Sequence, residues 1–215
     1  MEELTRRERE RKVREEEIIS AAEKLFFEKG FHDTSMDEIA KEAQFTKKTL
    51  YQYFINKEDL YFTVAARAMQ MLITYFEKGI ENGTSGLDKI RLLSEAYYDY
   101  YKDYPLSFRL MNYCQFIQTP REDISHYYRI SDGKNKLFQY FTDVFEEGKA
   151  DGSIRKDLNT KDTVLSLFLL ITGFFSRFAE LKKIDIDKDN KNHEQFISST
   201  LNLIEHALIT ENSVK

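Results

Sequence analysis

Two helix-start signals follow one another closely in the chain, at Ser35 and at Thr46. Ser35 precedes a glutamate by three positions, which is the pattern of a capping box, and apolar residues then recur at helical spacing. Only two residues separate the end of that short helix from Thr46, which can cap a second helix over residues 47–54. Two such short helices must pack on a third, and residues 17–29 have the spacing for one. The sequence therefore predicts a helix-turn-helix motif.

Helical segments continue through the rest of the chain, where proline and glycine are scarce. The 215 residues include only 2 prolines and 8 glycines, which favours long helices over a turn-rich β fold. We predict an all-α fold of about nine helices, in which a three-helix helix-turn-helix domain with a charged extension occupies residues 1–60 and a larger helical domain occupies residues 61–215. The expected helices of the second part begin near Lys57, end at Pro105 and Pro120, bend near residues 131–135, and close with segments 160–182 and 191–210.

Several functional classes find no support in the sequence. The single cysteine cannot form an internal disulfide, which suits a reducing cytoplasm. The charged amino terminus lacks the apolar core of a signal peptide, and the most apolar segment, residues 163–181, falls short of the roughly 20 apolar residues that span a bilayer. The four histidines are scattered, and no HExxH, paired-cysteine or glycine-rich phosphate motif occurs. We therefore expect a cytoplasmic protein that is not an enzyme, needs no cofactor or metal, and does not enter a membrane.

The second short helix has two different faces when its residues are projected at about 100° per residue. One face is mainly apolar and can pack on the neighbouring helices. The opposite face is basic, aromatic and able to form hydrogen bonds. The inward residues are Thr46, Leu50, Tyr53 and Phe54, and the outward residues are Lys48, Tyr51 and Gln52, flanked by Lys47 and Thr49.

The outward face is free of acidic residues in a chain that is acidic as a whole. Acidic residues outnumber basic ones by 37 to 32, yet none occurs from Gln44 through Lys57. Lysines neutralise phosphates, and Lys, Gln and Thr side chains can reach donors and acceptors on base edges. The face therefore fits double-stranded DNA. The simpler alternative is a solvated helix surface, on which an exposed Tyr51 would be unusual.

Residues 30–60, GFHDTSMDEIAKEAQFTKKTLYQYFINKEDL, resemble the DNA-binding domain of the TetR family of transcriptional regulators. The shared features are Gly followed by an aromatic residue, a Thr, an Ile-Ala pair, a Lys-x-Thr-Leu-Tyr-x-Tyr-Phe recognition helix and a Lys-Glu-x-Leu sequence. The resemblance implies a homodimer that binds an inverted-repeat operator and a carboxy-terminal domain that binds a small effector. It implies DNA contacts at Thr34, Ser35, Thr46, Lys47, Lys48, Thr49, Tyr51, Gln52 and Lys57.

Two positions depart from the pattern of that family. Gln44 holds the turn position at which the family usually has Gly, so it must accept a left-handed backbone at a cost of roughly 1–2 kcal/mol. Lys48 stands where the family often has a small residue and adds a long cation to the outward face. We therefore expect this protein to have an operator preference of its own.

The segment 5–14 contains six basic residues and two glutamates. One interpretation is a basic arm that reaches an adjacent groove of DNA. The other, which we favour, is an extension of the first helix with charge pairs at i,i+3 and i,i+4. The extension leaves partial DNA contact through Arg11 or Arg14 open.

Aromatic residues, above all tyrosines, gather between residues 97 and 128. Each buried tyrosine hydroxyl needs a partner, so a tyrosine cluster near polar residues fits a cavity, with a plain core as the alternative. We predict a pocket for an apolar or aromatic effector, whose charge the sequence does not decide. The predicted lining is Tyr97, Tyr101, Phe108, Arg109, Asn112, Tyr113, Phe116, Tyr128 and Phe175.

The last two expected helices carry more apolar surface than one core requires. The helix over 160–182 is apolar on more than one side, and the final helix has an apolar stripe. A second subunit can cover both in a four-helix bundle, which also places two recognition helices about 34 Å apart, although a monomer core remains the alternative. The predicted interface is Phe168, Phe174, Phe178, Phe196, Thr200, Leu201, Ile204 and Leu208.

Together these features predict a bacterial, ligand-responsive transcriptional regulator. We expect a repressor that leaves a palindromic operator when a small molecule binds the carboxy-terminal domain. As the resemblance implies, effector binding would shift the helix that begins at Lys57 and change the separation of the recognition helices. Two alternatives remain: an activator or ligand-independent regulator, and a helical binding protein or enzyme whose helix-turn-helix is vestigial.

Overall fold

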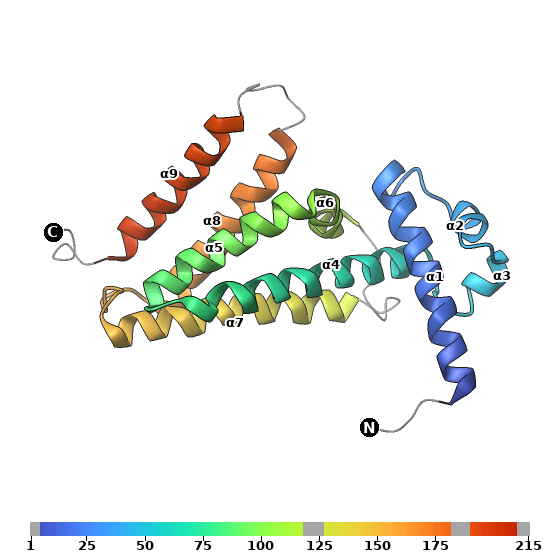
Figure 1. The fold of residues 1–215 in the computed structure, drawn as a ribbon, viewed down its shortest axis with the longest axis horizontal. Coiled ribbons are helices and arrows are strands. Elements are labelled where there is room, and N and C mark those ends of the chain that lie inside the picture. The colour runs from blue at the N-terminus through green and yellow to red at the C-terminus, as the bar shows by residue number, and fades with distance from the viewer. Residues whose placement is uncertain (1–4, 118–126, 182–189, 210–215) are drawn as a thin grey trace. The chain divides into compact units, whose positions relative to one another are not determined.

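The computed structural model describes residues 5–117, 127–181 and 190–209, and these residues form nine α-helices and no strand. The predicted all-α class and the number of helices are therefore confirmed. The elements are α1 (Arg6–Lys29), α2 (Met36–Glu42), α3 (Lys47–Leu50), α4 (Lys57–Gly79), α5 (Gly86–Asp103), α6 (Pro105–Tyr113), α7 (Tyr127–Asp151), α8 (Thr160–Leu181) and α9 (Asn190–Leu208), with 3-10 turns at Ile80–Asn82 and Cys114–Phe116 (Figure 1).

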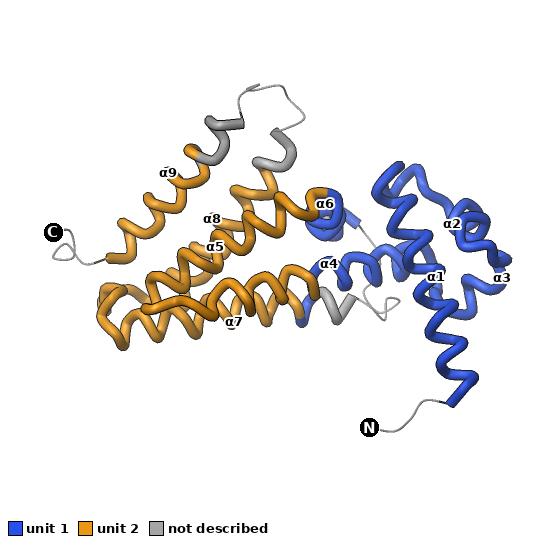
Figure 2. The backbone as a smooth tube through the Cα atoms, in the orientation of Figure 1, with its two compact units in different colours: residues 1–69, 106–132 blue, residues 70–105, 133–215 orange. Residues whose placement is uncertain are grey.

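The chain divides into two compact units, which Figure 2 shows in different colours. The first unit comprises residues 1–69 and 106–132, and the second comprises residues 70–105 and 133–215. Helix α4 runs without a break from the first unit into the second. The predicted functional division at residue 60 stays a prediction, because the units are defined by packing alone.

Helix α7 differs from its prediction, because it continues through the expected bend at residues 131–135. An isolated glycine inside a helix costs only about 1 kcal/mol relative to alanine. Gly133 is buried, and Leu137 and Phe141 are buried further along the same helix. Burial of these apolar side chains offsets the weak local signal for a break.

Helices α5 and α7 cross in the second unit with almost no space between their backbones. A Cβ atom added at Gly86 would lie 2.1 Å from the backbone nitrogen of Gly148, closer than packed atoms can approach. The N–H of Gly86 donates to Oδ2 of Asp151 at 2.8 Å, and the N–H of Leu87 donates to Oγ of Ser153 at 3.1 Å. The residues around Asp151 therefore satisfy backbone donors at the start of α5, and glycine permits the approach.

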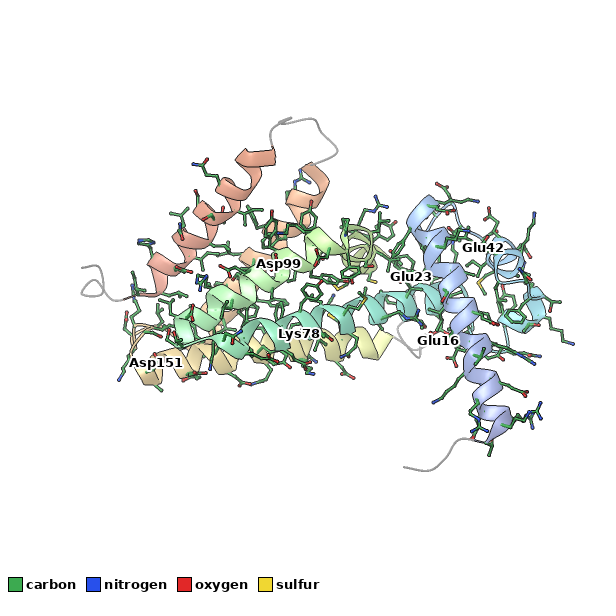
Figure 3. All side chains as sticks on the ribbon, in the orientation of Figure 1. Glu16, Glu23, Glu42, Lys78, Asp99 and Asp151 are labelled. Atoms are coloured by element: carbon green, nitrogen blue, oxygen red, sulfur yellow. The ribbon has the colours of Figure 1, made fainter. Side chains whose placement is uncertain are left out.

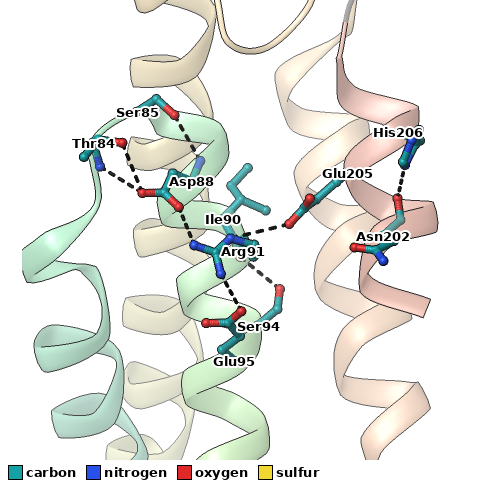
Figure 4. A network of polar contacts seen from close by, with 10 residues as sticks. All are labelled: Thr84, Ser85, Asp88, Ile90, Arg91, Ser94, Glu95, Asn202, Glu205 and His206. Atoms are coloured by element: carbon teal, nitrogen blue, oxygen red, sulfur yellow. Dashed lines mark hydrogen bonds and ion pairs between the residues drawn. The ribbon is translucent and has the colours of Figure 1, made fainter. Parts of the chain in front are cut away.

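A charged network lies between α5 and α9 (Figure 4). Arg91 donates to Asp88 and to Glu95 at 2.6 Å each, whereas the Oε1 atom of Glu205 on α9 lies 3.8 Å from its Nε. That oxygen is buried and accepts no hydrogen bond from the residues that the structure describes. Burial raises the pKa of Glu205, and Arg91 opposes the rise. Because Arg91 already serves two carboxylates of its own helix, apolar packing must hold α9 in place.

That apolar packing comes from one stripe of α9. Ile197, Leu201 and Leu208 are buried, and they recur at helical spacing along the helix. Among the helices of the described ranges, α8 included, none combines the length and the hydropathy that crossing a membrane requires.

Candidate nucleic-acid interface

Helix α2 begins at a complete capping box. The Oγ atom of Ser35 accepts from the N–H of Glu38 at 3.3 Å, and the Glu38 carboxylate accepts from the N–H of Ser35 at 2.9 Å. Lys29 on α1 donates to the same carboxylate at 2.6 Å. This hydrogen bond first, and then those from Ser35, lower the pKa of Glu38 to about 2. The cap therefore stays charged at neutral pH, and its contribution to stability is lost only as the pH falls through that value.

Thr34 lies in the interior of the first unit. Its side chain is only 2% exposed, and its hydroxyl donates to the carbonyl of Gly30 at 2.7 Å. The hydroxyl thus stabilises the turn between α1 and α2. The predicted contact of Thr34 with the DNA backbone remains a prediction, and this hydroxyl already has an acceptor.

The turn between α2 and α3 is closed by a left-handed residue, as the sequence predicts. Gln44 has a φ of 58° and is the only non-glycine residue with positive φ in the described ranges. Its N–H donates to the carbonyl of Lys41 at 3.2 Å, and the N–H of Phe45 donates to that of Ala40 at 2.9 Å. These two bonds are the Schellman pattern, in which the left-handed position usually belongs to glycine.

Helix α3 is shorter than its prediction. The side chain of Thr46 accepts from the N–H of Thr49 at 3.1 Å, so the predicted cap is confirmed, but the helix ends at Leu50 and not at Phe54. The carbonyl of Leu50 accepts from the N–H groups of both Tyr53 and Phe54, at 2.9 and 3.0 Å. The bond from Tyr53 tightens the last turn, because an i→i+3 bond winds the chain more closely than the i→i+4 bond of an α-helix does.

The predicted two faces of this segment are present in part, because Thr46, predicted to face inward, is exposed at the cap and Tyr53 is only half-buried. Leu50 and Phe54 are buried, while Lys48, Tyr51 and Gln52 are exposed. Tyr51 leaves 48% of its surface in solvent. An exposed aromatic side chain of this size is unusual on a helix face that contacts only water. The exposed side chains can reach a groove of DNA, whereas the buried ones fix the segment to its own unit.

The two adjacent lysines have different surroundings. Lys47 donates to Asp37 of α2 at 2.8 Å, and this hydrogen bond raises the pKa of Lys47. Lys48 forms no ion pair with any residue that the structure describes. The stretch without acidic residues in the sequence thus meets an acidic residue from the preceding helix, and Lys48 is the more available cation.

Lys57 serves the fold in this structure. Its ammonium donates to the carbonyls of Phe31 at 2.7 Å and Thr34 at 2.8 Å, with His32 at 3.4 Å, and it lies 4.3 Å from the centre of the Phe31 ring. Its three N–H groups therefore already have acceptors. The predicted phosphate contact of Lys57 stays a prediction, and it would compete with these bonds.

The predicted effector residues are divided between the two units of the described chain, and the pocket that they would line stays a prediction. Tyr113 belongs to the first unit, where its hydroxyl lies 2.7 Å from Nε2 of His32 and its ring 6.2 Å from that of Tyr61. In the second unit, the rings of Tyr97 and Phe175 are 5.5 Å apart. Arg109, Asn112, Phe108 and Phe116 lie in the first unit with Tyr113, and Tyr101 lies in the second, while the Tyr128 side chain is outside the described residues.

An open hollow of about 590 Å³ lies in the second unit between α4 and α5. Tyr75 and Tyr104 contribute to its walls, together with Glu95 and Asp99. None of the nine predicted effector residues lines this hollow. The sequence analysis missed Tyr75, because Tyr75 lies on α4, outside the stretch in which tyrosines are dense. Nowhere in the described ranges do three or more His, Cys, Asp or Glu side chains gather in a way that could hold a metal ion.

The capped helix pair, its buried anchors and its exposed lysine define a helix-turn-helix DNA-binding regulator with a helical carboxy-terminal domain. The family described as "Bacterial regulatory proteins, tetR family" matches residues 18–64. An HTH-type transcriptional regulator of Staphylococcus aureus is 31% identical over 182 residues, which cover 83% of this chain and 88% of that protein. The chain belongs to the TetR family. It is a transcriptional regulator and not an enzyme.

Two further similarities concern an activator and a solved structure. The HTH-type transcriptional activator FasR of Mycolicibacterium smegmatis is 29% identical over 111 residues, 52% of this chain and 51% of that protein. A crystal structure of the regulator FadR from Bacillus subtilis, in complex with stearoyl-CoA, has a TM-score of 0.68 and 20% identity, and covers 90% of this chain and 97% of that chain. The second likeness concerns the fold.

The strained turn gives a stability prediction. Gln44→Gly should raise the free energy of unfolding by about 0.5–1 kcal/mol. Glycine removes the cost of roughly 1–2 kcal/mol of the left-handed backbone, but it also raises the conformational entropy of the unfolded chain, which cancels part of that gain. Urea denaturation measures the difference. Gln52→Gly is the matched control, since Gln52 is exposed and has no positive φ, and it should lower the stability. A Gln44→Gly protein that is less stable than wild type contradicts the argument.

The unequal surroundings of the two lysines give a binding prediction. Lys48→Ala should weaken DNA binding more than Lys47→Ala, because Asp37 already neutralises Lys47. Loss of one phosphate contact should reduce the slope of log K against log salt by about 0.9 per subunit. Fluorescence anisotropy over a salt series, with a duplex selected from a random library by the wild-type protein, measures both quantities. Equal effects of the two substitutions would show that the Asp37 pair is irrelevant to binding.

Proposed function

We propose that this regulator is a cytoplasmic repressor that leaves a palindromic operator when a small molecule binds its carboxy-terminal domain. The observation that carries the proposal is the continuity of α4. The helix starts at Lys57, whose ammonium is bonded to carbonyls of the turn before α2, and it extends to Gly79 in the second unit. A displacement of the far part of α4 would therefore reach the base of the helix-turn-helix without an intervening loop.

An apolar or aromatic effector is favoured by the side chains of the second unit. The rings of Tyr97 and Tyr98 lie 5.5 and 5.8 Å from that of Phe175, and Tyr101 stacks on Tyr98 at 6.4 Å. An aromatic cluster of this kind would suit ligands with a large apolar part. The likeness to the FadR complex with stearoyl-CoA supports the same class of effector.

A homodimer through α8 and α9 is part of the proposal, with an interface that differs from the sequence prediction. Leu201 and Leu208 are buried within one subunit, and the Phe168 ring lies 6.0 Å from that of Phe138 on α7. Phe174, Thr200 and Ile204 are half-buried, and the side chains of Phe178 and Phe196 lie outside the described residues. Among the side chains of these two helices that the structure describes, the large apolar ones left exposed are Leu165, Leu169, Leu170 and Leu203.

These leucines support dimerisation because their exposure costs free energy in an isolated subunit. Leu169 and Leu170 are 60% and 59% exposed, and Leu203 is 73% exposed. Burial of a leucine side chain stabilises by about 1.5–3 kcal/mol, so a second copy of α8 and α9 would gain from covering them.

Activation is the second candidate, and it rests on the similarity to the activator FasR, which covers about half of each chain. An activator and a repressor bind DNA with the same domain. The direction of the effect on transcription therefore has to be measured.

In vitro transcription separates the two candidates. From a promoter that overlaps a site selected by the wild-type protein, added protein should lower the amount of transcript, and stearoyl-CoA should restore it. More transcript on adding protein would identify an activator. Repression that stearoyl-CoA leaves unchanged would exclude long-chain acyl-CoA as the effector.

The proposed interface predicts the oligomeric state of two matched variants. Leu169→Glu should convert the dimer into a monomer, because it would place charges in the apolar interface. Leu106→Glu is the control, since Leu106 is 43% exposed on α6, outside the proposed interface. Sedimentation velocity measures the mass of each species. A dimeric Leu169→Glu protein would place the interface elsewhere.

A further inference from the structure

The amino-terminal half of α1 carries a row of arginines in line with its buried stripe. Ile18, Ala22 and Leu25 are buried and lie on one side of the helix. Arg14, Arg11 and Arg7 continue that side toward the amino terminus, because steps of three and four residues keep side chains within about 60° of one another. The side of α1 that begins as a core face therefore ends as an arginine stripe, defined here as Arg7, Arg11 and Arg14.

The arginine stripe has no carboxylate partner in the described chain. Its three side chains are exposed and form no ion pair there. Three of the nearby carboxylates have other partners: Glu10 pairs with Arg6 at 2.9 Å, Glu8 caps the helix through Thr5, and Glu16 pairs with Arg67. The charge of the stripe is therefore available to an external anion.

The stripe lies on the side of the unit that carries the recognition segment. The Arg11 guanidinium is 5.7 Å from the centre of the Tyr53 ring, and Tyr53 directly follows the exposed Tyr51 and Gln52. Figure 1 shows the first turns of α1 continuing past the part of the unit that holds α2 and α3. The two acidic residues labelled on this helix in Figure 3, Glu16 and Glu23, both follow the last arginine of the stripe in the sequence.

The arginine stripe also lies outside the residues that the family model matches. The family match begins at residue 18, after the last arginine of the stripe. The segment is helical and not a loose arm, since α1 begins at Arg6 with a complete capping box. Its three guanidinium groups are therefore held at fixed spacing along a rigid element.

We propose that the arginine stripe binds backbone phosphates of the DNA that flanks each operator half-site. Arginine is suited to this because its planar guanidinium donates two parallel hydrogen bonds to phosphate oxygens. Contacts to phosphates position a protein on DNA without reading the base sequence. The stripe would therefore increase the affinity and lengthen the footprint on DNA, while the recognition segment sets the base preference. The proposal rests on the DNA-binding activity of the family and extends its footprint.

Two duplexes and two triple variants test the proposal. The short duplex is the smallest one that the wild-type dimer selects from a random library, and the long duplex adds about 10 bp, one helical turn, on each side. Wild-type protein should bind the long duplex more tightly. The stripe variant combines Arg7→Ala, Arg11→Ala and Arg14→Ala. It should bind the short duplex like wild type and lose the extra affinity that the flanks give. On the long duplex, its slope of log K against log salt should be shallower by about 2.7 per subunit.

The matched control removes the same charge from the other side of α1. Arg6→Ala with Arg9→Ala and Lys12→Ala should keep most of the gain from the flanks. Alanine favours helix, so far-ultraviolet circular dichroism should show an intact α1 in both variants. Equal losses in the two variants would reduce the effect to net charge and overturn the proposal. The proposal also fails if the stripe variant keeps the full gain from the flanks. Binding of both proteins to phosphatidylserine vesicles tests a membrane surface as the alternative anionic partner, and a stripe variant that loses only this binding would likewise overturn the proposal.

Discussion

The left-handed backbone at Gln44 is the constraint on which the recognition segment depends. It lets the chain leave α2 through two hydrogen bonds, to Lys41 and Ala40, and start α3 after only two more residues. A longer loop would leave the direction of α3 to weaker contacts. Because the turn is fixed, Leu50 and Phe54 can be buried while Lys48 and Tyr51 remain exposed. The cost of a glutamine in this conformation is offset by the order it gives to the outward face.

Lys57 connects that turn to the long helix that follows. Its ammonium is bonded to carbonyls just before α2, so the start of α4 and the entry to the helix-turn-helix are one hydrogen-bonded unit. The sequence position of the same lysine predicts a DNA contact, yet its donors are bonded to carbonyls of the protein. This arrangement gives α4 a direct mechanical link to the recognition segment, and that link is what a ligand-responsive mechanism requires.

The charges of the first unit are sorted by geometry more than by sequence. Asp37 lies ten positions before Lys47 and faces it, so one of two adjacent lysines is paired. On α1 the reverse holds, because Glu8 and Glu10 have other partners, and Arg7, Arg11 and Arg14 form no ion pair in the described ranges. A count of acidic residues nearby in the sequence would instead predict that Lys47 is free to bind an anion and that the arginines of α1 are paired. The unit can therefore belong to an acidic chain and still present cations where phosphates would lie.

The sequence by itself determined the features that depend on neighbouring residues. The caps at Ser35 and Thr46, the strained Gln44, the all-α class and the family could all be predicted, because capping and helical periodicity act over three or four positions. Only the tertiary structure decided the partners of Lys47 and Lys57, the assignment of Tyr113 and Tyr97 to different packing units, and the side of α9 that stays exposed. These outcomes depend on which segments, distant along the chain, are brought together, and neither periodicity nor local charge contains that information.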